Sequence, residues 1–315
     1  MRILITGVSG FVGRHLLSHL SEQQVGCEIH GTVIANEAHF GDTRVIKHIV
    51  DLKDTVAVAE IVDRIQPDQV YHLAAMSSPR RSFEIPWETL ENNIRAQLNI
   101  FLACLRLKAR PKVLVVTSAE IYGPVKADQL PVREDSALCP TNPYGVSKVA
   151  QDMLALQYYM SHHLPTVRVR PFNHIGPGQS EGFVATDFAK QIARIEAGFQ
   201  EPIIEVGNLS AERDFTDVRD VVRAYRLIME NGMAGSVFNV ASGQAYSIHN
   251  LLEILLGYSS SKIKVHQEAA RMMPIDVPVV RGDATRLNEL TGWKPQISFE
   301  TSLLDVLNDW RQRTK

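Results

Sequence analysis

Short apolar and β-branched runs alternate with longer amphipathic stretches over the first 172 residues of the chain. The runs have the length of strands, and the stretches between them repeat apolar residues every three or four positions, as one face of a helix does. This alternation predicts an α/β fold with a parallel sheet covered by helices. We expect strands at 2–6, 28–34, 44–50, 69–73, 112–118 and 166–171, and helices at 11–21, 55–65, 87–107 and 143–161.

The regular alternation ends after Phe172, where a loop rich in glycine and proline begins. Further helices are expected at 184–197, 218–230, 249–256 and 300–311, and the last three have Asp217, Ser247 and Ser298 as predicted N-caps. We therefore predict a first domain over 1–172, to which part of 218–245 returns, and a smaller mixed α/β domain over 173–315.

Three glycines, Gly7, Gly10 and Gly13, follow the first predicted strand and open the first predicted helix. Glycine lets the backbone turn tightly and approach a pyrophosphate, whose charge is stabilised by the free N–H groups and the dipole of the helix. We interpret this turn, which includes Phe11 and Val12, as a dinucleotide-binding loop. The alternative is a plain strand-to-helix turn that uses glycine for its positive φ.

The sequence leaves the choice between NAD and NADP open. The end of the second predicted strand has neither a well-placed acid for a ribose hydroxyl nor an arginine for a 2′-phosphate. Asp51, followed by Leu52, comes directly after the third predicted strand, where it is placed to meet the edge of the adenine ring. Its alternative role is the N-cap of the next helix.

Tyr144 and Lys148 are four residues apart, so they share one face of the helix that they open. A phenol is a poor acid–base group at pH 7, and a nearby cation lowers its pKa by favouring the phenolate. Lys148 is also a candidate to hold the ribose of a nicotinamide. Two other pairs have the same spacing, but a proline interrupts one and a serine-rich loop contains the other, Tyr122 with Lys126 and Tyr258 with Lys262.

Ser118 ends the strand predicted at 112–118, at the carboxyl edge where open α/β sheets bind ligands. Its hydroxyl is therefore a candidate to hydrogen-bond a substrate carbonyl, beside the phenol of Tyr144. The alternative is that Ser118 serves only as a turn residue.

Composition narrows the classes of protein that the chain can be. Of the 315 residues, 45% are hydrophobic and 22% are charged, which is typical of a folded protein. The net charge of −2 gives no positive field that would attract nucleic acid or anionic lipid. Apolar runs are too short for a membrane span, and the early first strand leaves no room for a signal segment, so a cytoplasmic location is expected. Cys27, Cys104 and Cys139 lie too far apart for a disulfide framework or a zinc knuckle. No third ligand accompanies His15 and His19, so no metal is expected.

The chain resembles the extended short-chain dehydrogenase/reductase superfamily in the order and spacing of four motifs, TGVSGFVG (6–13), HLAA (72–75), TSAEIYG (117–123) and YGVSK (144–148). Segments 170–183, 206–220, 275–283 and 291–295 resemble the GDP-sugar branch of that superfamily. Within the branch, the short chain and the intact GPGQS loop look more like the reductases of GDP-4-keto-6-deoxy-D-mannose than the longer GDP-mannose 4,6-dehydratases.

The resemblance implies a Rossmann domain, a doubly wound parallel sheet that binds NAD(P)H, and a C-terminal domain that binds a GDP-linked sugar. It gives the catalytic positions to Ser118, Tyr144 and Lys148. It assigns cofactor contacts to Leu73, Ala74 and Ala75, and substrate contacts to Asn173, Lys190 and Arg213. The superfamily commonly dimerises through the helices expected here at 87–107 and 143–161, so a homodimer is expected.

Alternatives remain for two of these cations. Lys190 also fits an exposed helical lysine, and Arg213 fits an ion pair with Asp214 or Asp217.

Two residues depart from the pattern or leave it ambiguous. Met273 stands where an arginine is expected before the DVP segment, so a phosphate or base contact is missing or comes from Arg271 or Arg281. Glu120 lies two residues after Ser118, where dehydratases of the branch carry the glutamate that removes the C5 proton.

The expected function is reduction by NAD(P)H of the C4 keto group of GDP-4-keto-6-deoxy-D-mannose to GDP-D-rhamnose. Glu120 keeps a GDP-mannose 4,6-dehydratase as the first alternative. Another nucleotide-sugar epimerase or dehydratase, and a protein that binds NAD(P) without turnover, are the further alternatives.

Overall fold

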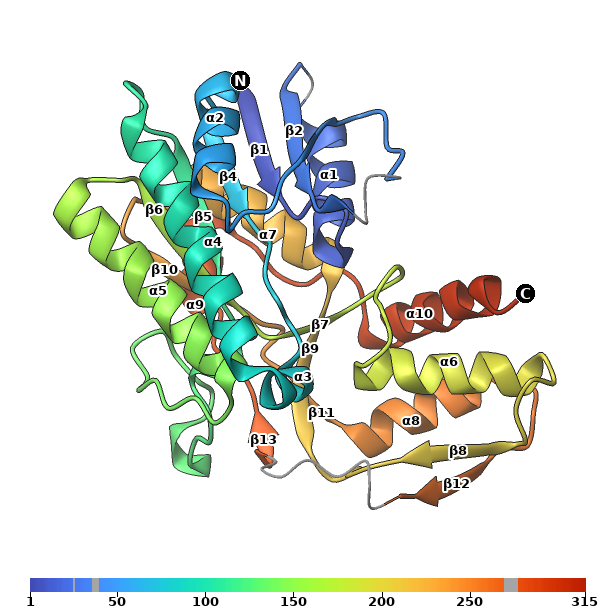
Figure 1. Cartoon of the computed structure of the whole chain (residues 1–315). Coiled ribbons are helices and arrows are strands. Elements are labelled where there is room, and N and C mark those ends of the chain that lie inside the picture. The colour runs from blue at the N-terminus through green and yellow to red at the C-terminus, as the bar shows by residue number, and fades with distance from the viewer. Residues whose placement is uncertain (25, 36–39, 269–276) are drawn as a thin grey trace.

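The protein is described by a computed structural model that covers residues 1–24, 26–35, 40–268 and 277–315. Its central element is a seven-stranded sheet in the order β10-β6-β5-β4-β1-β2-β3, in which every neighbouring pair is parallel (Figure 1). The seven strands are β1 (Arg2–Thr6), β2 (Glu28–Val33), β3 (Ile46–Ile49), β4 (Gln69–His72), β5 (Lys112–Val116), β6 (Thr166–Pro171) and β10 (Val237–Val240). The predicted doubly wound parallel α/β fold is therefore confirmed.

The apolar runs form this sheet because both of its faces are buried. Alternate residues of β1 enter different cores: Ile3 and Ile5 pack on one face and Leu4 on the other, all with no exposed surface. A strand buried on both faces must be apolar at nearly every position, which explains why these runs lack polar alternation.

Helices cover both faces of the sheet (Figure 1). The first face carries α1 (Phe11–Gln23), α7 (Val218–Asn231) and α9 (Thr285–Thr291), which share one buried apolar core. The second face carries α2 (Thr55–Ile65), α4 (Pro86–Arg106) and α5 (Pro143–His162), which share another. The short α3 (Pro79–Glu84) precedes α4.

A second layer of structure lies beyond the carboxyl ends of the strands, at the lower right of Figure 1. Its helices are α6 (Val184–Glu196), α8 (Ile248–Gly257) and α10 (Phe299–Arg313), and they enclose a separate apolar core. A small mixed sheet joins β7 (Asn173–Ile175), β9 (Glu212–Asp217), β11 (Ala245–Ser247) and β13 (Val279–Val280). A two-stranded sheet joins β8 (Ile203–Val206) and β12 (Lys264–Gln267).

The N-caps predicted for the late helices are confirmed. The side chain of Asp217 accepts from the N–H of Arg219 at the start of α7, and Ser247 and Ser298 cap α8 and α10 in the same way. These oxygens satisfy N–H groups that have no partner inside the helix.

Four predicted strands are shorter than expected: β2 and β4 lose their last residue, and β3 and β5 are shortened further because a side chain ends each of them. Before β3, the backbone and guanidinium of Arg44 bind the carboxylate of Asp42, which holds that residue in a turn. After β5, the Ser118 hydroxyl accepts from the N–H of Glu120 and starts the short 3-10 helix η2 (Ala119–Ile121). A second 3-10 turn, η3 (Ala127–Gln129), follows.

Part of the segment 218–245 lies with the large sheet, since α7 packs beside α1 and β10 pairs with β6. The domain boundary between 172 and 173 stays a prediction. Among the described residues, no helix is long and apolar enough to cross a membrane. Arg271 and Met273, for which the sequence raised a phosphate or base contact, lie outside the described residues.

Candidate active site

A cavity of about 660 Å³ opens at the carboxyl edge of the large sheet. The edge includes the point between β1 and β4 where the strand order reverses, which is where open α/β sheets bind ligands. Residues of both layers form the wall of the cavity. The wall includes most residues predicted for the site: Gly7, Gly10, Phe11, Val12, Gly13, Asp51, Leu52, Leu73, Ala74, Ala75, Ser118, Glu120, Tyr144, Lys148, Asn173 and Arg213.

The glycine turn leaves the start of α1 open toward this cavity. Gly7 has a φ of +69°, which favours glycine, and Gly10 is the N-cap of α1 without any side-chain cap. A Cβ at Gly13 would lie 2.3 Å from the carbonyl oxygen of Gly7, so only glycine fits where α1 lies against the backbone of the turn. Uncapped N–H groups and a backbone without side chains fit the pyrophosphate of a dinucleotide.

Gly13→Ala is expected to weaken NAD(P)H binding at least about tenfold, because the added methyl overlaps backbone of the binding turn at a cost of about 1–3 kcal/mol. Fluorescence titration of NADPH and the Tm of each protein measure the effect. Gly257→Ala is the matched control, since a Cβ there has no neighbour within 4 Å. Binding by Gly13→Ala as tight as in the wild type would contradict the role of the turn.

The HLAA segment is held against this turn by a residue that the sequence did not single out. The hydroxyl oxygen of Thr6 accepts from the N–H groups of Leu73 and Ala74, each at 3.1 Å. Because that oxygen already accepts twice, its hydrogen is directed to Nδ1 of His72 at 3.0 Å. Thr6 thus fixes the loop after β4 along the cavity wall, and a threonine at the end of a strand carries no signal of this in the sequence.

The alternative role for Asp51 is wrong. The N-cap of α2 is Asp54, whose carboxylate accepts from the N–H groups of Val56 and Ala57. Asp51 is exposed at the cavity, and one of its oxygens accepts from the N–H of Lys53 at 2.9 Å. Its contact with an adenine ring stays a prediction.

Tyr144 and Lys148 lie one turn apart at the start of α5, and both side chains are buried against the cavity. The ammonium of Lys148 is 5.7 Å from the centre of the Tyr144 ring and donates to the carbonyl oxygen of Val116 at 2.9 Å. Ser118 lies beside Tyr144 in the cavity wall, as the hydrogen-bond partner that lowers the pKa of the phenol. The cavity wall therefore holds a serine from the segment after β5, together with a tyrosine and a lysine from α5.

Neither of the two other tyrosine–lysine pairs has this geometry. Tyr122 follows the last residue of η2, and Tyr258 follows the last residue of α8, so neither pair continues along a helix. The use of local context to separate them from Tyr144 is confirmed.

The pKa of the Tyr144 phenol differs from the expectation that Lys148 lowers it. Burial raises the pKa of Tyr144 above its ordinary value, the hydrogen bond with Ser118 acts in the opposite direction, and the charge of Glu120 raises it further. Burial also lowers the pKa of Lys148 to about 7. Burial is the largest cause of the shift in the pKa of Tyr144, which remains a protonated phenol at neutral pH.

Glu120 is held in the cavity by Asn142, a residue that the sequence reasoning missed. The side-chain amide of Asn142 donates to the Glu120 carboxylate at 2.8 Å, and its oxygen accepts from the N–H of Gly145 at 2.7 Å as the N-cap of α5. An asparagine directly before Pro143 is a signal of a helix start and was available in the sequence. The link places a carboxylate in the cavity, near enough to Tyr144 for its charge to raise the pKa of the phenol.

Two predicted substrate residues reach the cavity from the second layer. Asn173 begins β7, and Arg213 lies in β9 with its guanidinium donating to the carbonyl oxygens of Glu212 and Val277 at 2.9 and 2.7 Å. The ion pairs considered for Arg213 do not form, because Asp214 accepts from Ser242, Gly243 and Gly282, and Asp217 pairs with Arg219. Substrate binding by these residues stays a prediction.

Lys190 and Arg281 lie outside the cavity wall. Lys190 forms an ion pair with Glu181 and lies over the ring of Trp310. The backbone carbonyl oxygen of Arg281 accepts from the N–H of Val132 at 2.8 Å. The structure does not bring these two cations to the rest of the site, and their substrate roles remain sequence predictions.

Several lining residues come from segments that sequence reasoning did not assign to the site. They belong to α3, to β7 and to the loop between β7 and α6, and they include Phe83, His174, Gln179, Ser180 and Phe183. The GPGQS motif pointed to that loop, whereas α3 has no motif of its own.

Fold and site together define an enzyme class built on a Rossmann sheet with a serine, tyrosine and lysine at its ligand-binding edge. A model of the GDP-mannose 4,6 dehydratase family matches residues 4–306, and the chain belongs to this family. It is 37% identical to GDP-6-deoxy-D-mannose reductase of Pseudomonas aeruginosa, over 100% of this chain and 98% of that protein. It is 29% identical to GDP-mannose 4,6 dehydratase 1 of Arabidopsis thaliana, over 94% of this chain and 86% of that protein.

Solved structures agree with this assignment. RMD from Pseudomonas aeruginosa in complex with NADPH is 35% identical, with a TM-score of 0.88 over 99% of both chains. UDP-glucose 4-epimerase of Thermotoga maritima with UDP-glucose is 25% identical, with a TM-score of 0.88 over 100% of both chains. The resemblance identified from the sequence motifs is thus confirmed.

Proposed function

We propose that this protein uses NADPH or NADH to reduce the C4 keto group of GDP-4-keto-6-deoxy-D-mannose, forming GDP-D-rhamnose. One observation carries the proposal. The cavity places Ser118, Tyr144 and Lys148 beside a glycine turn suited to a dinucleotide, in a chain that aligns along its whole length with a GDP-6-deoxy-D-mannose reductase.

The chain's own residues supply polarisation, a proton and orientation. When bound, the reduced nicotinamide supplies the hydride that C4 receives. The Ser118 hydroxyl donates a hydrogen bond to the carbonyl oxygen, and as the carbon–oxygen π electrons move onto that oxygen, Tyr144 donates its phenolic proton there. Lys148 orients the ribose, and Asn173 and Arg213 bind the sugar diphosphate at the far side of the cavity.

The protonation of Tyr144 suits this direction of reaction. An acid must hold its proton before the carbonyl is reduced, and burial together with the charge of Glu120 keeps the pKa of the phenol high. A negatively charged cofactor beside Lys148 would favour the ammonium and so assist the phenol once its proton has left.

The GDP-mannose 4,6-dehydratase reaction is the second candidate, because the carboxylate of Glu120 lies in the cavity. That reaction needs a base at C5 and returns its hydride to the sugar, so it consumes no reductant. Glu120→Gln separates the two functions: a dehydratase would lose its base, whereas ketone reduction uses Ser118 and Tyr144.

The test is an incubation with GDP-mannose, alone and together with a known 4,6-dehydratase, while NADH and NADPH oxidation is followed and the sugar product is identified. We expect reductant to be consumed only with the dehydratase present, with a 6-deoxyhexose product, and Glu120→Gln to keep most of this activity. A 4-keto-6-deoxy product from GDP-mannose alone, lost in Glu120→Gln, would assign the dehydratase reaction instead. Nucleotide binding without turnover of GDP-mannose or of its 4-keto-6-deoxy product would contradict both proposed reactions.

We further propose a homodimer formed through α4 and α5. Val146, Met153 and Met160 repeat every seven residues on α5 and are 46%, 39% and 66% exposed, and Trp87 and Leu102 of α4 are 72% and 41% exposed. Exposed apolar side chains on two adjacent helices are the kind of surface that a second helix pair covers. A cytoplasmic location is proposed with it, supported by three free cysteines of which Cys139 is exposed.

A further inference from the structure

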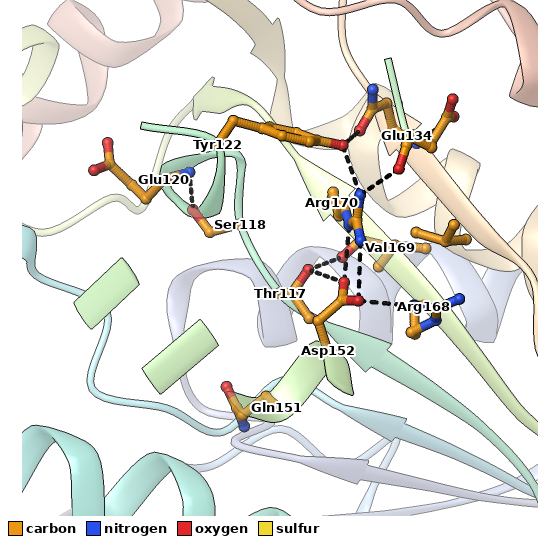
Figure 2. A network of polar contacts seen from close by, with 12 residues as sticks. Thr117, Ser118, Glu120, Tyr122, Glu134, Gln151, Asp152, Arg168, Val169 and Arg170 are labelled. Atoms are coloured by element: carbon orange, nitrogen blue, oxygen red, sulfur yellow. Dashed lines mark hydrogen bonds and ion pairs between the residues drawn. The ribbon is translucent and has the colours of Figure 1, made fainter. Parts of the chain in front are cut away.

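A buried network of charges lies directly behind the catalytic helix, and the proposed chemistry does not use it. Asp152 follows Lys148 by one turn of α5, and its side chain has no exposed surface. The guanidinium of Arg170 on β6 binds this carboxylate with two parallel bonds, Nε to Oδ2 at 2.8 Å and Nη2 to Oδ1 at 3.0 Å. Figure 2 shows Asp152 between the two arginines of β6.

The other side of the same guanidinium holds the segment that carries the catalytic serine. Nη1 of Arg170 donates to the hydroxyl of Tyr122 at 3.0 Å and to the carbonyl oxygen of Glu134 at 2.8 Å. The Tyr122 hydroxyl in turn donates to Oδ1 of Asn239 on β10 at 2.7 Å. Tyr122 follows η2, the short helix that Ser118 caps, so one rigid group joins α5 to the serine segment.

A weaker contact supports the same connection. The hydroxyl of Thr117, the residue before Ser118, lies 3.4 Å from Oδ2 of Asp152 and donates to the carbonyl oxygen of Val169 at 3.0 Å. In Figure 2 the side chain of Glu120 points away from this network, so the carboxylate in the cavity is not part of it.

Arg168 binds the same Asp152 carboxylate as Arg170, but it does not contact the segment that carries Ser118. Its Nη1 donates to Oδ1 of Asp152 at 2.8 Å, and its Nη2 donates to the carbonyl oxygen of Gly235 at 3.1 Å, away from Ser118 and Tyr122. Arg168 and Arg170 therefore have the same partner, strand and burial, with side chains 7% and 3% exposed, but only Arg170 reaches the serine segment.

Stability alone gives little reason for charges at this place. A buried ion pair is often no more stable than apolar side chains of the same size, because both charges lose their hydration. A planar guanidinium bound by two bonds does, however, fix the distance and the angle between its partners, which a flexible ammonium does not.

We propose that Arg170 is a positioning residue, which together with Asp152 and Tyr122 sets Ser118 relative to Tyr144 so that both hydroxyls act on one carbonyl oxygen. The inference rests on the proposed function, since it concerns the reduction step. A displacement of about 1 Å in such an arrangement lowers turnover by up to about 100-fold.

Tyr122→Phe is the first test, because it removes one hydroxyl and keeps the ring that stacks on Phe172 at 6.3 Å. We expect kcat to fall about tenfold or more, while KM and the dissociation constant of NADPH stay within about twofold. A double-mutant cycle with Ser118→Ala gives the decisive readout: in the Ser118→Ala background, Tyr122→Phe changes kcat by less than about twofold, because no serine is left to position.

Arg170→Lys and Arg168→Lys form the matched pair of variants. Arg170→Lys is expected to lower kcat at least as much as Tyr122→Phe, and Arg168→Lys to lower Tm while keeping kcat within about twofold. Equal losses of kcat in both arginine variants, additive effects in the cycle, or unchanged kcat in Tyr122→Phe would each overturn the proposal. Absence of turnover in the wild type would overturn the proposed function, and this inference with it.

Discussion

Tyr144→Phe is expected to lower kcat about 100-fold to 10,000-fold, the range over which a positioned general acid accelerates proton transfer. The phenol is the group whose hydroxyl meets Ser118 in the cavity, and its proton is held firmly because burial raises its pKa. The substitution removes this proton and leaves the glycine turn and Lys148 in place. NADPH binding should therefore persist although turnover is lost.

Two measurements separate this loss from a general disturbance of the fold. Fluorescence titration should give a dissociation constant for NADPH close to that of the wild type, and Tm should change by only a few degrees. Tyr159→Phe removes a phenol from the same helix at a position outside the cavity wall, and it should keep normal turnover. A Tyr144→Phe protein with a kcat near that of the wild type would refute the assignment of the acid.

Lys148→Met is expected to raise the stability of the folded protein, most strongly below pH 7. Burial lowers the pKa of Lys148 from 10.5 to about 7, and a difference of that size corresponds to roughly 5 kcal/mol. The substitution also loses the hydrogen bond to Val116, worth about 1 kcal/mol. The net expectation is a gain of several degrees in Tm near pH 6.

The pH dependence has a definite sign. Below pH 7 the lysine is charged in both the folded and the unfolded chain, so the folded wild type bears the whole cost of a buried ammonium. Between pH 7 and 10.5 the folded protein releases this proton while the unfolded chain keeps it. The free-energy cost of burying Lys148 therefore falls steadily across this range and is gone above pH 10.5. The difference in Tm between Lys148→Met and the wild type should therefore shrink as pH rises from 6 to 10.

Lys108→Met provides the control, because Lys108 is exposed at the end of α4 and its ammonium remains hydrated. Its Tm should follow that of the wild type at every pH. A Tm difference for Lys148→Met that stays constant from pH 6 to 10 would show that burial does not perturb this lysine. A stabilised protein with impaired turnover would show that the charge is kept for binding and chemistry.

Six of the seven strands of the large sheet follow from local pattern to within a few residues, whereas β10 and the covering helix α9 were not predicted. The predicted bounds of β1, β6 and α2 agree with the structure, because apolar runs and amphipathic repeats reflect burial directly. The ends of other elements depend on single side chains, such as Ser118 at η2, whose hydroxyl is equally able to cap or to extend a strand. Strands of the smaller sheets were missed, since three or four residues carry too little periodicity.

The candidate site was predicted best where a motif lies on one stretch of chain. The glycine turn, the HLAA segment and the pair of Tyr144 and Lys148 all line the cavity. Lys190 was assigned by resemblance alone and lies against Trp310 instead, outside the cavity wall. Asn142 had a signal as a helix cap, but its contact with Glu120 joins two segments 22 residues apart.

By itself the sequence determined the α/β class and predicted the glycine turn, the serine, the tyrosine and the lysine that line the cavity, because these depend on short-range spacing and residue chemistry. Only the tertiary structure decided which residues share the cavity, that Asp54 rather than Asp51 caps α2, and that burial raises the pKa of Tyr144. It alone revealed the link from Asp152 through Arg170 to Tyr122. Burial and contact arise from the packing of segments that are distant in the chain, and a local pattern does not contain that information.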